Sequence, residues 1–244
     1  MNIPWLEPDD ALPPVERALR RPNGLLAAGG GLSVSRLLGA YERGCFPWYN
    51  EGEPVLWWSP DPRMVLFPGE LHVSRSLRRR VRRGGFEVRF DHAFRDVIFA
   101  CADSRDGVAG TWITPDIRCA YEELHQAGHA HSVETWMDGE LAGGLYGVSI
   151  GRAFFGESMF ARRDDASKLA LVFLVTQLAR WGFGVIDCQQ KTSHLASFGA
   201  REIPRAEFLR RLRACTSQSG PGSWRFDADL SAAIGAGALE NASS

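Results

Sequence analysis

Cysteine is scarce in this chain, and the five cysteines are odd in number and widely scattered. No two of them have the C-x-x-C spacing of a redox or zinc motif. We therefore expect reduced thiols, as in a cytoplasmic protein, and no framework of disulfides. Cys119, His125, His129 and His131 could suggest zinc, but their spacing matches no closed structural site, so we expect no metal.

Long apolar runs are missing as well. The longest, residues 169–178, is too short to cross a bilayer, and residues 1–10 have neither the basic nor the apolar region of a signal peptide. A soluble, cytoplasmic protein with no membrane partner is the expectation. The chain also has no excess of basic charge: its net charge is −1, which excludes a uniformly basic nucleic-acid binder. Any contact with a polyanion must come from a local patch.

The composition changes along the chain and divides it into three parts. Residues 1–65 contain prolines, glycines and aromatic loops, and we expect a small N-terminal α+β domain there. Residues 66–215 alternate more regularly and are expected to form the main domain. Ser, Gly and Ala dominate residues 216–244, which predicts a loosely ordered C-terminal tail.

Turn and cap signals fix the elements of the main domain. Asp138-Gly139 predicts a two-residue hairpin turn between strands 131–137 and 140–149. Thr114-Pro115 predicts the start of a helix over 116–127. Hairpin strands that are followed by helix, strand and helix indicate an α+β domain with a mixed sheet, not a doubly wound one. Further helices are expected at 36–43, 74–83, 93–102, 166–181 and 205–214, and further strands at 86–90, 153–160 and 185–189.

Two polar residues stand out in the apolar strand 185–189. Because side chains alternate along a strand, Asp187 and Gln189 are expected to share one face. They are costly to bury without partners, so one interpretation is a satisfied buried network or an edge facing water. The other is a polar pair at a strand end that takes a proton or holds an amine.

Glu157 is a similar exception, because it lies within a strongly aromatic strand. Charged groups are seldom buried without a partner. In a purely structural role its partner would be Arg162 or Arg163. In a functional role it would bind a cationic substrate.

The predicted helix 74–83 contains six basic residues and no acidic one. Such charge runs are usually solvated faces. Like charges one turn apart repel, however, and a polyanion would relieve that cost, which favours a phosphate-backbone contact. Four tryptophans in loop or turn contexts could stack on bases or belong to the core. The basic residues are Arg75, Arg78, Arg79, Arg80, Arg82 and Arg83, and the tryptophans are Trp48, Trp57, Trp58 and Trp112.

Taken together, the motifs resemble those of bacterial leucyl/phenylalanyl-tRNA–protein transferases over residues 21–212. The motifs are Gly44-Cys45-Phe46-Pro47-Trp48, Leu56-Trp57-Trp58-Ser59-Pro60-Asp61-Pro62-Arg63, Gly110-Thr111-Trp112-Ile113-Thr114, Gly128-His129-Ala130-His131-Ser132, Gly156-Glu157-Ser158-Met159-Phe160 and Ile186-Asp187-Cys188-Gln189. The resemblance implies a small N-terminal domain joined to a GNAT-like acyltransferase domain. It also implies transfer of Leu or Phe, with Met as a further candidate, from aminoacyl-tRNA to proteins that begin with Arg or Lys, which marks them for degradation. No cofactor is implied.

The resemblance also assigns roles by position. Asp187 and Gln189 correspond to the family's catalytic pair, and Glu157 corresponds to its acidic contact with the acceptor. Trp48 and Trp112 correspond to the aromatic residues that hold the terminal adenosine. The amino-acid pocket would contain Leu145, Phe154, Met159 and Ile186, and the tRNA-binding surface would contain Arg75, Arg78, Arg79, Arg82 and Arg83.

Two other functions are consistent with part of this pattern. An acetyl-CoA-dependent N-acetyltransferase of the same fold needs a Gln/Arg-x-x-Gly-x-Gly/Ala run that opens a helix, and no suitable run is present. A non-catalytic RNA-binding protein would leave Glu157, Asp187 and Gln189 unexplained. The resemblance implies aminolysis of an activated ester, with no covalent enzyme intermediate.

Overall fold

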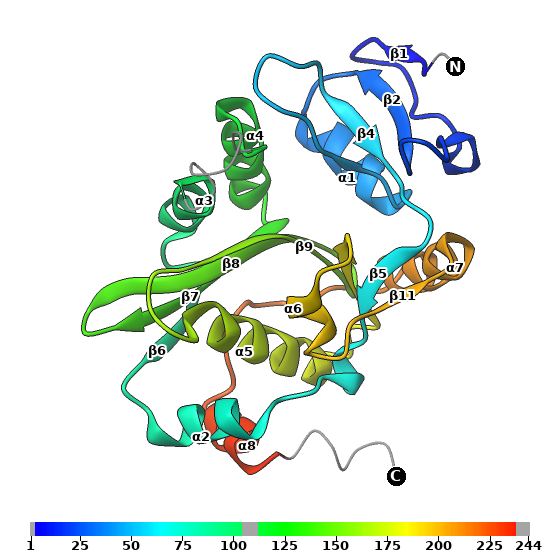
Figure 1. Cartoon of the computed structure of the whole chain (residues 1–244). Helices are drawn as coiled ribbons and strands as arrows, with labels where there is room; N and C mark the ends of the chain where they lie inside the picture. The colour runs from blue at the N-terminus through cyan, green and yellow to red at the C-terminus, as the bar shows by residue number, and fades with distance from the viewer. Residues whose placement is uncertain (1–2, 104–111, 238–244) are drawn as a thin grey trace.

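The computed structural model describes residues 3–103 and 112–237, and two sheets organise this part of the chain (Figure 1). The smaller sheet has the order β1-β2-β4-β3 and packs with one helix, α1 (Val34–Glu42). Its strands are β1 (Trp5–Leu6), β2 (Leu25–Gly29), β3 (Phe46–Pro47) and β4 (Leu56–Trp58), and a short 3-10 turn, η1 (Val15–Arg17), lies between β1 and β2.

The larger sheet has seven strands in the order β11-β5-β10-β9-β8-β7-β6. Its neighbours are antiparallel except for β9 and β10, which run parallel. The prediction of an α+β chain with a mixed sheet is therefore confirmed. The strands are β5 (Arg63–Leu66), β6 (Glu87–Phe90), β7 (Ala130–Met137), β8 (Glu140–Ile150), β9 (Ala153–Ala161), β10 (Val185–Gln189) and β11 (Arg201–Ile203).

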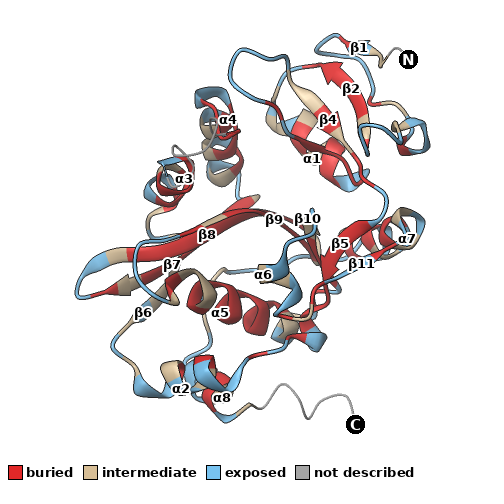
Figure 2. Cartoon of the chain, in the orientation of Figure 1, coloured by how far each residue is buried: buried red, intermediate tan, exposed pale blue. Residues whose placement is uncertain are grey.

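Helices cover both faces of the large sheet (Figures 1 and 2). On one face lies α5, which is buried on almost every side, together with α2 and α8. The other face packs against α3, α4 and α7 and, through them, against the N-terminal elements. The helices are α2 (Arg75–Arg83), α3 (Phe94–Asp103), α4 (Pro115–Gln126), α5 (Ala166–Arg180), α6 (Ser193–Ala196), α7 (Arg205–Thr216) and α8 (Leu230–Ala236), with a 3-10 turn, η2 (Pro68–Glu70).

The local signals in the sequence account for these elements. Ser33, Ser74 and Thr114 each accept a hydrogen bond from the backbone N–H three residues later, and the helix start that was predicted at Thr114-Pro115 is confirmed. The turn between β7 and β8 has φ values of 53° at Asp138 and 80° at Gly139. Two positive φ angles are what the tightest hairpin turn requires. None of the described helices is long and apolar enough to span a membrane.

The change from one sheet to the other occurs before residue 65. β4 ends at Trp58 in the small sheet, whereas β5 begins at Arg63 in the large one. The connection 59–62 includes a cis bond before Pro62. We therefore propose that the domains meet in this connection, and not at residue 65.

The prediction of a loosely ordered tail is wrong for residues 217–237. Trp224 and Phe226 pack against the core that surrounds α5, and Leu230 and Ile234 are buried on one face of α8. The many Ser, Gly and Ala residues concealed these anchors, because four large apolar side chains contribute little to the average composition.

Candidate functional site

β9 and β10 separate at the site, and this separation positions the polar residues Glu157 and Gln189 that the sequence singled out. The two strands pair from Val185 to Asp187 and then separate. A register shift follows between Asp187 and Gln189, and Gln189 has φ +61°, a conformation that non-glycine residues rarely adopt. The next polar group on β9, Glu157, lies two residues past the last position paired with β10, Phe155, so it faces the opening from the middle of β9 while Gln189 faces it from the end of β10.

A cavity of about 760 Å³ occupies this opening. One end of it is apolar and lies over α5, where Leu171 and Leu174 join the predicted pocket residues. The predicted residues that line it are Trp48, Trp112, Leu145, Phe154, Glu157, Met159, Ile186 and Gln189. Among the described residues on its wall, Glu157 alone has a carboxyl group, and none is Lys or Arg. The cavity therefore combines an apolar pocket with one acid.

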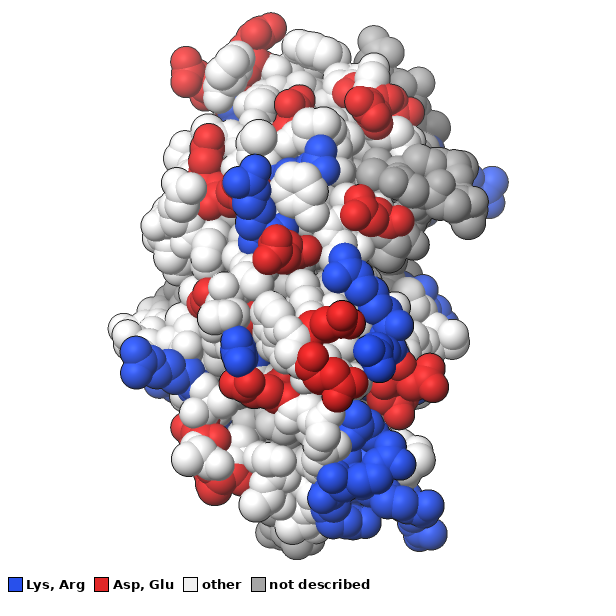
Figure 3. Space-filling model, turned by 90° about the vertical axis from the view of Figure 1, so that its left-hand side faces the viewer, with Lys and Arg blue, Asp and Glu red and all other residues white. Residues whose placement is uncertain are grey.

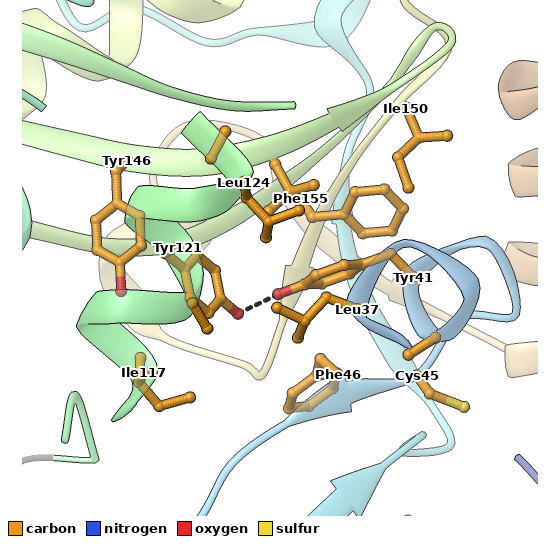
Figure 4. Close-up of a cluster of buried hydrophobic side chains, with 14 of the residues drawn as sticks. Leu37, Tyr41, Cys45, Phe46, Ile117, Tyr121, Leu124, Tyr146, Ile150 and Phe155 are labelled. Atoms are coloured by element: carbon orange, nitrogen blue, oxygen red, sulfur yellow. Dashed lines mark hydrogen bonds between the residues drawn. The ribbon is translucent and has the colours of Figure 1, made fainter. Parts of the chain in front are cut away.

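The carboxyl group of Glu157 is only 8% exposed and is held by three side chains. Tyr41 donates to Oε1 at 2.7 Å, Tyr121 donates to Oε2 at 3.0 Å, and the Gln189 amide donates to Oε1 at 2.8 Å. The two phenol groups also contact each other (Figure 4). Arg162 is not among these partners, so the predicted arginine partnership is wrong for this residue.

Arg163 is not a partner of Glu157 either, because its guanidinium lies near Asp138 and Glu140 at the β7–β8 turn, at 3.6 Å from each. Neither tyrosine was identified from the sequence. Tyr41 and Tyr121 fall on the apolar faces of α1 and α4, where nothing in the spacing distinguishes them from core residues.

The proton count of this cluster favours a protonated acid. Three close contacts join Glu157, Tyr41 and Tyr121, but the two phenols supply only two protons. A proton on the carboxyl group supplies the third hydrogen bond and so closes the ring of hydrogen bonds between the three side chains. Burial raises the pKa of Glu157 to about 7, although hydrogen bonds from Tyr41 and Tyr121 lower it. Burial, and then the charge of Glu157, raises the pKa of both tyrosines well above 10.0. Glu157 is therefore the group of this cluster that titrates near neutrality.

Asp187 lies behind the cavity and does not line it. Its carboxylate accepts two hydrogen bonds from Arg63, from Nε at 2.8 Å and from Nη2 at 2.7 Å. Oδ1 also accepts the backbone N–H of Gln189 at 2.9 Å. The expectation that Asp187 meets the substrate amine is thus contradicted, because its oxygens are occupied and the side chain is fully buried. Its place in the structure is that of a residue that holds Gln189.

Arg63 is a third residue that sequence reasoning missed, although it ends one of the motifs quoted above. Its guanidinium is fully buried between the rings of Phe46 and Phe208, at 4.7 and 4.8 Å from their centroids. Such contacts stabilise a buried cation and leave its N–H groups free to bind a carboxylate in the ring plane. The pair therefore joins β5 to β10 beneath the site.

Aromatic side chains form the mouth of the cavity. Trp48 is 39% exposed and packs edge-on against Trp58, with 5.5 Å between ring centroids. Trp58 in turn donates from its indole N–H to the carbonyl of Trp48 at 2.7 Å. Trp112 is buried on the cavity wall, whereas Gly110 and Thr111 of the same motif lie outside the described residues. A partly exposed, braced indole at a cavity mouth can stack on a base.

The arginine helix, α2, lies at the foot of the molecule, where Lys and Arg side chains gather in Figure 3. Leu77 and Val81 bury one of its faces. The other face exposes Arg75, Arg79, Arg82 and Arg83, while Arg78 and Arg80 are half-buried. Arg80 donates to the carbonyl of Gly84, and Arg82 donates to that of Gly235 at 2.8 Å.

A buried carboxyl group with a pKa near neutrality, beside a deep apolar pocket, is typical of an enzyme that performs acid–base chemistry on an apolar group.

Comparison with known proteins identifies the family. The model described as "Leucyl/phenylalanyl-tRNA protein transferase" matches residues 65–213, and the model of that family's N-terminal domain matches residues 30–61. The chain belongs to the leucyl/phenylalanyl-tRNA–protein transferase family. It is therefore an aminoacyltransferase that moves an aminoacyl group from tRNA to a protein.

Individual relatives are similar over most of their length. The leucyl/phenylalanyl-tRNA–protein transferase of Aromatoleum aromaticum is 61% identical over 91% of this chain and 94% of its own. The enzyme of Nitrosospira multiformis is 60% identical over 92% and 97%. Among solved structures, a GCN5-related N-acetyltransferase from Kribbella flavida has a TM-score of 0.37 at 14% identity, and covers 68% of this chain and 59% of that one.

The Arg63–Asp187 pair gives a first test. Arg63→Met should lower the free energy of unfolding by about 3–5 kcal/mol, because it leaves a buried carboxylate without its partner. The double variant Arg63→Met/Asp187→Leu should recover most of that loss, since it removes both charges. Urea unfolding measures both values. A double variant that is as unstable as the single one would show that the pair is not what holds the strands.

The pKa of Glu157 gives a second test. Because that pKa lies above its unfolded value of about 4.5, the native state holds a proton that the unfolded chain loses as the pH rises. The unfolding free energy should therefore fall between about pH 4.5 and 7, by on the order of 3 kcal/mol, and stay level above. Glu157→Gln should abolish this fall, and Glu51→Gln, at an exposed carboxyl group, should keep it. An unaltered profile in Glu157→Gln would contradict the raised pKa.

Proposed function

We propose that the chain transfers Leu or Phe, with Met as a further donor, from aminoacyl-tRNA to the N-terminal α-amine of proteins that begin with Arg or Lys. Such proteins would thereby be marked for degradation, and the reaction would take place in the cytoplasm, where charged tRNA is available. The observation that supports this most is the position of Glu157, at the junction between the apolar pocket and the aromatic mouth of the cavity.

The apolar end of the cavity suits the donor side chain. Leu145, Phe154, Met159 and Ile186 offer the aminoacyl group a wall without charge. A flexible Met can adapt to side chains of different shape, which fits both a branched aliphatic and an aromatic donor. The relatives are named for both leucyl and phenylalanyl transfer, which supports the same two donors here.

The terminal adenosine of the tRNA would then lie at the mouth. Trp48 is exposed there and braced by Trp58, and Trp112 lies in the adjoining wall. With the side chain in the apolar end and the adenine on the indole, the ester carbon between them lies near Glu157 and Gln189. Proximity of this kind replaces a bimolecular encounter and can supply a large part of the rate.

Gln189 and Glu157 would act on the attacking amine together. The Gln189 amide donates to Glu157 through its nitrogen, so its oxygen is directed away from the carboxylate and can accept an N–H from the amine. A carboxyl group with a pKa of about 7 is well matched to an α-amino group, whose pKa is about 7.7–8.0. Glu157 would thus accept the proton as the C–N bond forms and return it to the ester oxygen, which leaves as the terminal hydroxyl group of the tRNA.

Direct attack by the amine also fits the state of the Cys188 thiol. Cys188 lines the cavity, but burial and the nearby charge of Asp187 raise its pKa, so the thiol stays protonated at neutral pH. A neutral thiol is a weak nucleophile. The ester of aminoacyl-tRNA is already activated, and so no acyl-enzyme is required.

The negative charge of ionised Glu157 accounts for the proposed preference for a cationic acceptor. Three of the four acceptor positions of the Glu157 carboxylate are used within the protein, which leaves one, on Oε2, for the attacking amine and none for a two-oxygen salt bridge with the acceptor side chain. Its ionised form would still be the one negative charge on the described wall, and in a low-dielectric cavity it would attract an Arg or Lys side chain over several ångströms.

A transfer assay tests this proposal. Leu-tRNA and Phe-tRNA should acylate peptides that begin with Arg or Lys, and not peptides that begin with Asp or carry an acetylated N-terminus. Glu157→Gln should reduce the rate about 10²–10⁴-fold, the usual value of general-base help. Cys188→Ala is the matched control on the same wall and should stay active. Normal turnover in Glu157→Gln, or none in Cys188→Ala, would refute the mechanism.

The arginine helix should govern tRNA affinity. Arg75, Arg79 and Arg83 are exposed, and neither of the bonds to Gly84 and Gly235 involves them. Replacing all three with Ala should raise KM for tRNA and reduce the slope of log K against log salt by roughly 2, at about 0.7–0.9 per lost phosphate contact. Arg95→Ala, 75% exposed on α3, is the control. An equal salt slope in the triple variant and the wild type would exclude α2 as the tRNA surface.

A further inference from the structure

The C-terminal segment 217–237 lies beyond the stretch that matches the family model, which ends at residue 213. Figure 1 shows it leaving α7, crossing the side of the sheet that carries α5, and ending in α8 at the foot of the molecule. On the way it places Trp224 against Phe154, a residue of the cavity wall. The segment therefore reaches the site from behind.

Trp224 rests on a fixed support. Its ring stacks on that of His131, with 3.6 Å between centroids and 14° between planes. His131 is itself held by Asp91, whose Oδ2 lies 2.8 Å from Nδ1. On the other side, Trp224 meets the ring of Phe154 at 6.2 Å and an angle of 43°. An indole that is stacked on a hydrogen-bonded ring cannot move without breaking that stack.

Phe154 is confined from the opposite direction by β8. A Cβ on Gly147 would lie 2.6 Å from Cε1 of Phe154, so the ring has room only because residue 147 has no side chain. Phe154 is 1% exposed and lines the apolar end of the cavity. In a close-packed interior the position of such a ring depends on the atoms behind it. Gly147 supplies such atoms on one side of the ring, and Trp224 supplies them on another.

The segment is anchored on both sides of Trp224's contact with the wall. Arg180 on α5 binds Asp227 at 2.7 Å and Asp229 at 2.6 Å. The backbone N–H of Asp227 donates to Oε1 of Gln177 at 2.8 Å, and Gly220 packs close to the carbonyl of Gly151. These contacts fix where the indole enters the core.

We propose that Trp224 is a positioning residue that sets the width of the aminoacyl side-chain pocket through Phe154, and thereby the preference between Leu and Phe. This inference rests on the proposed function, because it takes the apolar end of the cavity as the place of the donor side chain. If the indole is removed, the Phe154 ring can recede towards the space behind it. The pocket then widens and admits the larger side chain more readily.

The test is the ratio of kcat/KM for Phe-tRNA to that for Leu-tRNA, with one Arg-initiated peptide as acceptor. Trp224→Leu should raise this ratio about 3- to 10-fold, since one methylene in an apolar pocket discriminates by about tenfold or more. Trp224→Phe keeps an aromatic ring and should raise it less. Should Trp224→Leu fail to fold, the Trp224→Phe ratio decides: no rise overturns the inference.

Phe226→Leu is the matched control. Phe226 belongs to the same segment but packs on Phe90 at 3.8 Å and on Phe173 at 5.8 Å. It should lower the melting temperature as Trp224→Leu does and leave the ratio unchanged. A purely structural role for Trp224 predicts the same fall in melting temperature with no change in ratio in either variant, and that outcome would overturn the inference, as would equal shifts in both.

A variant on the cavity wall separates this inference from the proposal beneath it. Met159→Ala should shift the ratio whenever the apolar end binds the donor side chain. A shift in Met159→Ala without one in the Trp224 variants would overturn the role of Trp224 and leave the proposed function standing. No shift in any of them would mean that the donor side chain lies elsewhere, which overturns the role of Trp224 together with the assignment of the pocket. An absence of transfer from both Leu-tRNA and Phe-tRNA would instead refute the proposed function.

Discussion

The buried ion pair between Arg63 and Asp187 lies where every other part of the site converges. It joins the first strand of the large sheet after the N-terminal sheet, β5, to the strand that ends at the cavity, β10. The guanidinium is enclosed by Phe46 of the small sheet and Phe208 of α7. Two charges taken out of water are tolerated only if their geometry is good and their remaining atoms are bonded. Asp187 meets that condition by accepting the N–H of Gln189, and so the pair determines where the chain turns into the site.

That turn connects the ion pair to the chemistry. Gln189 adopts φ +61°, and a conformation so rarely populated persists only where its surroundings enforce it. Its amide then meets Glu157, which α1 and α4 secure with one tyrosine each. The N-terminal sheet and its helix thus supply Tyr41 and Trp48 to a site built on the large sheet. A carboxylate that must exchange a proton near pH 7 needs burial to raise its pKa and hydrogen bonds to keep it in place, and this arrangement provides both.

How much of the fold and of the site the sequence predicts depends on how far apart the interacting residues are along the chain. The Thr114-Pro115 cap and the Asp138-Gly139 turn act within four residues, and they predicted α4 and the β7–β8 hairpin correctly. The resemblance named eight residues that line one cavity. The sequence could not show that Asp187 bonds inward, because that depends on Arg63, 124 residues away. Nor could it single out Tyr41 and Tyr121, 80 residues apart, whose partner lies on a third element. Alternation along a strand predicts faces, but it does not predict a bulge at the end of that strand.

The C-terminal segment is a second case in which the sequence alone does not predict the structure. Its composition is that of a disordered tail, yet one indole and one phenyl ring decide its course, because each can bury as much apolar surface as several small residues. Once Trp224 lies on His131, the segment must cross behind Phe154, and its remaining length carries α8 to α2, where Arg82 meets the carbonyl of Gly235. The pocket wall and the arginine helix are thereby held by one stretch of chain. An aminoacyl-tRNA with its amino acid in the pocket and its phosphates on α2 would therefore contact both of the parts that this segment supports.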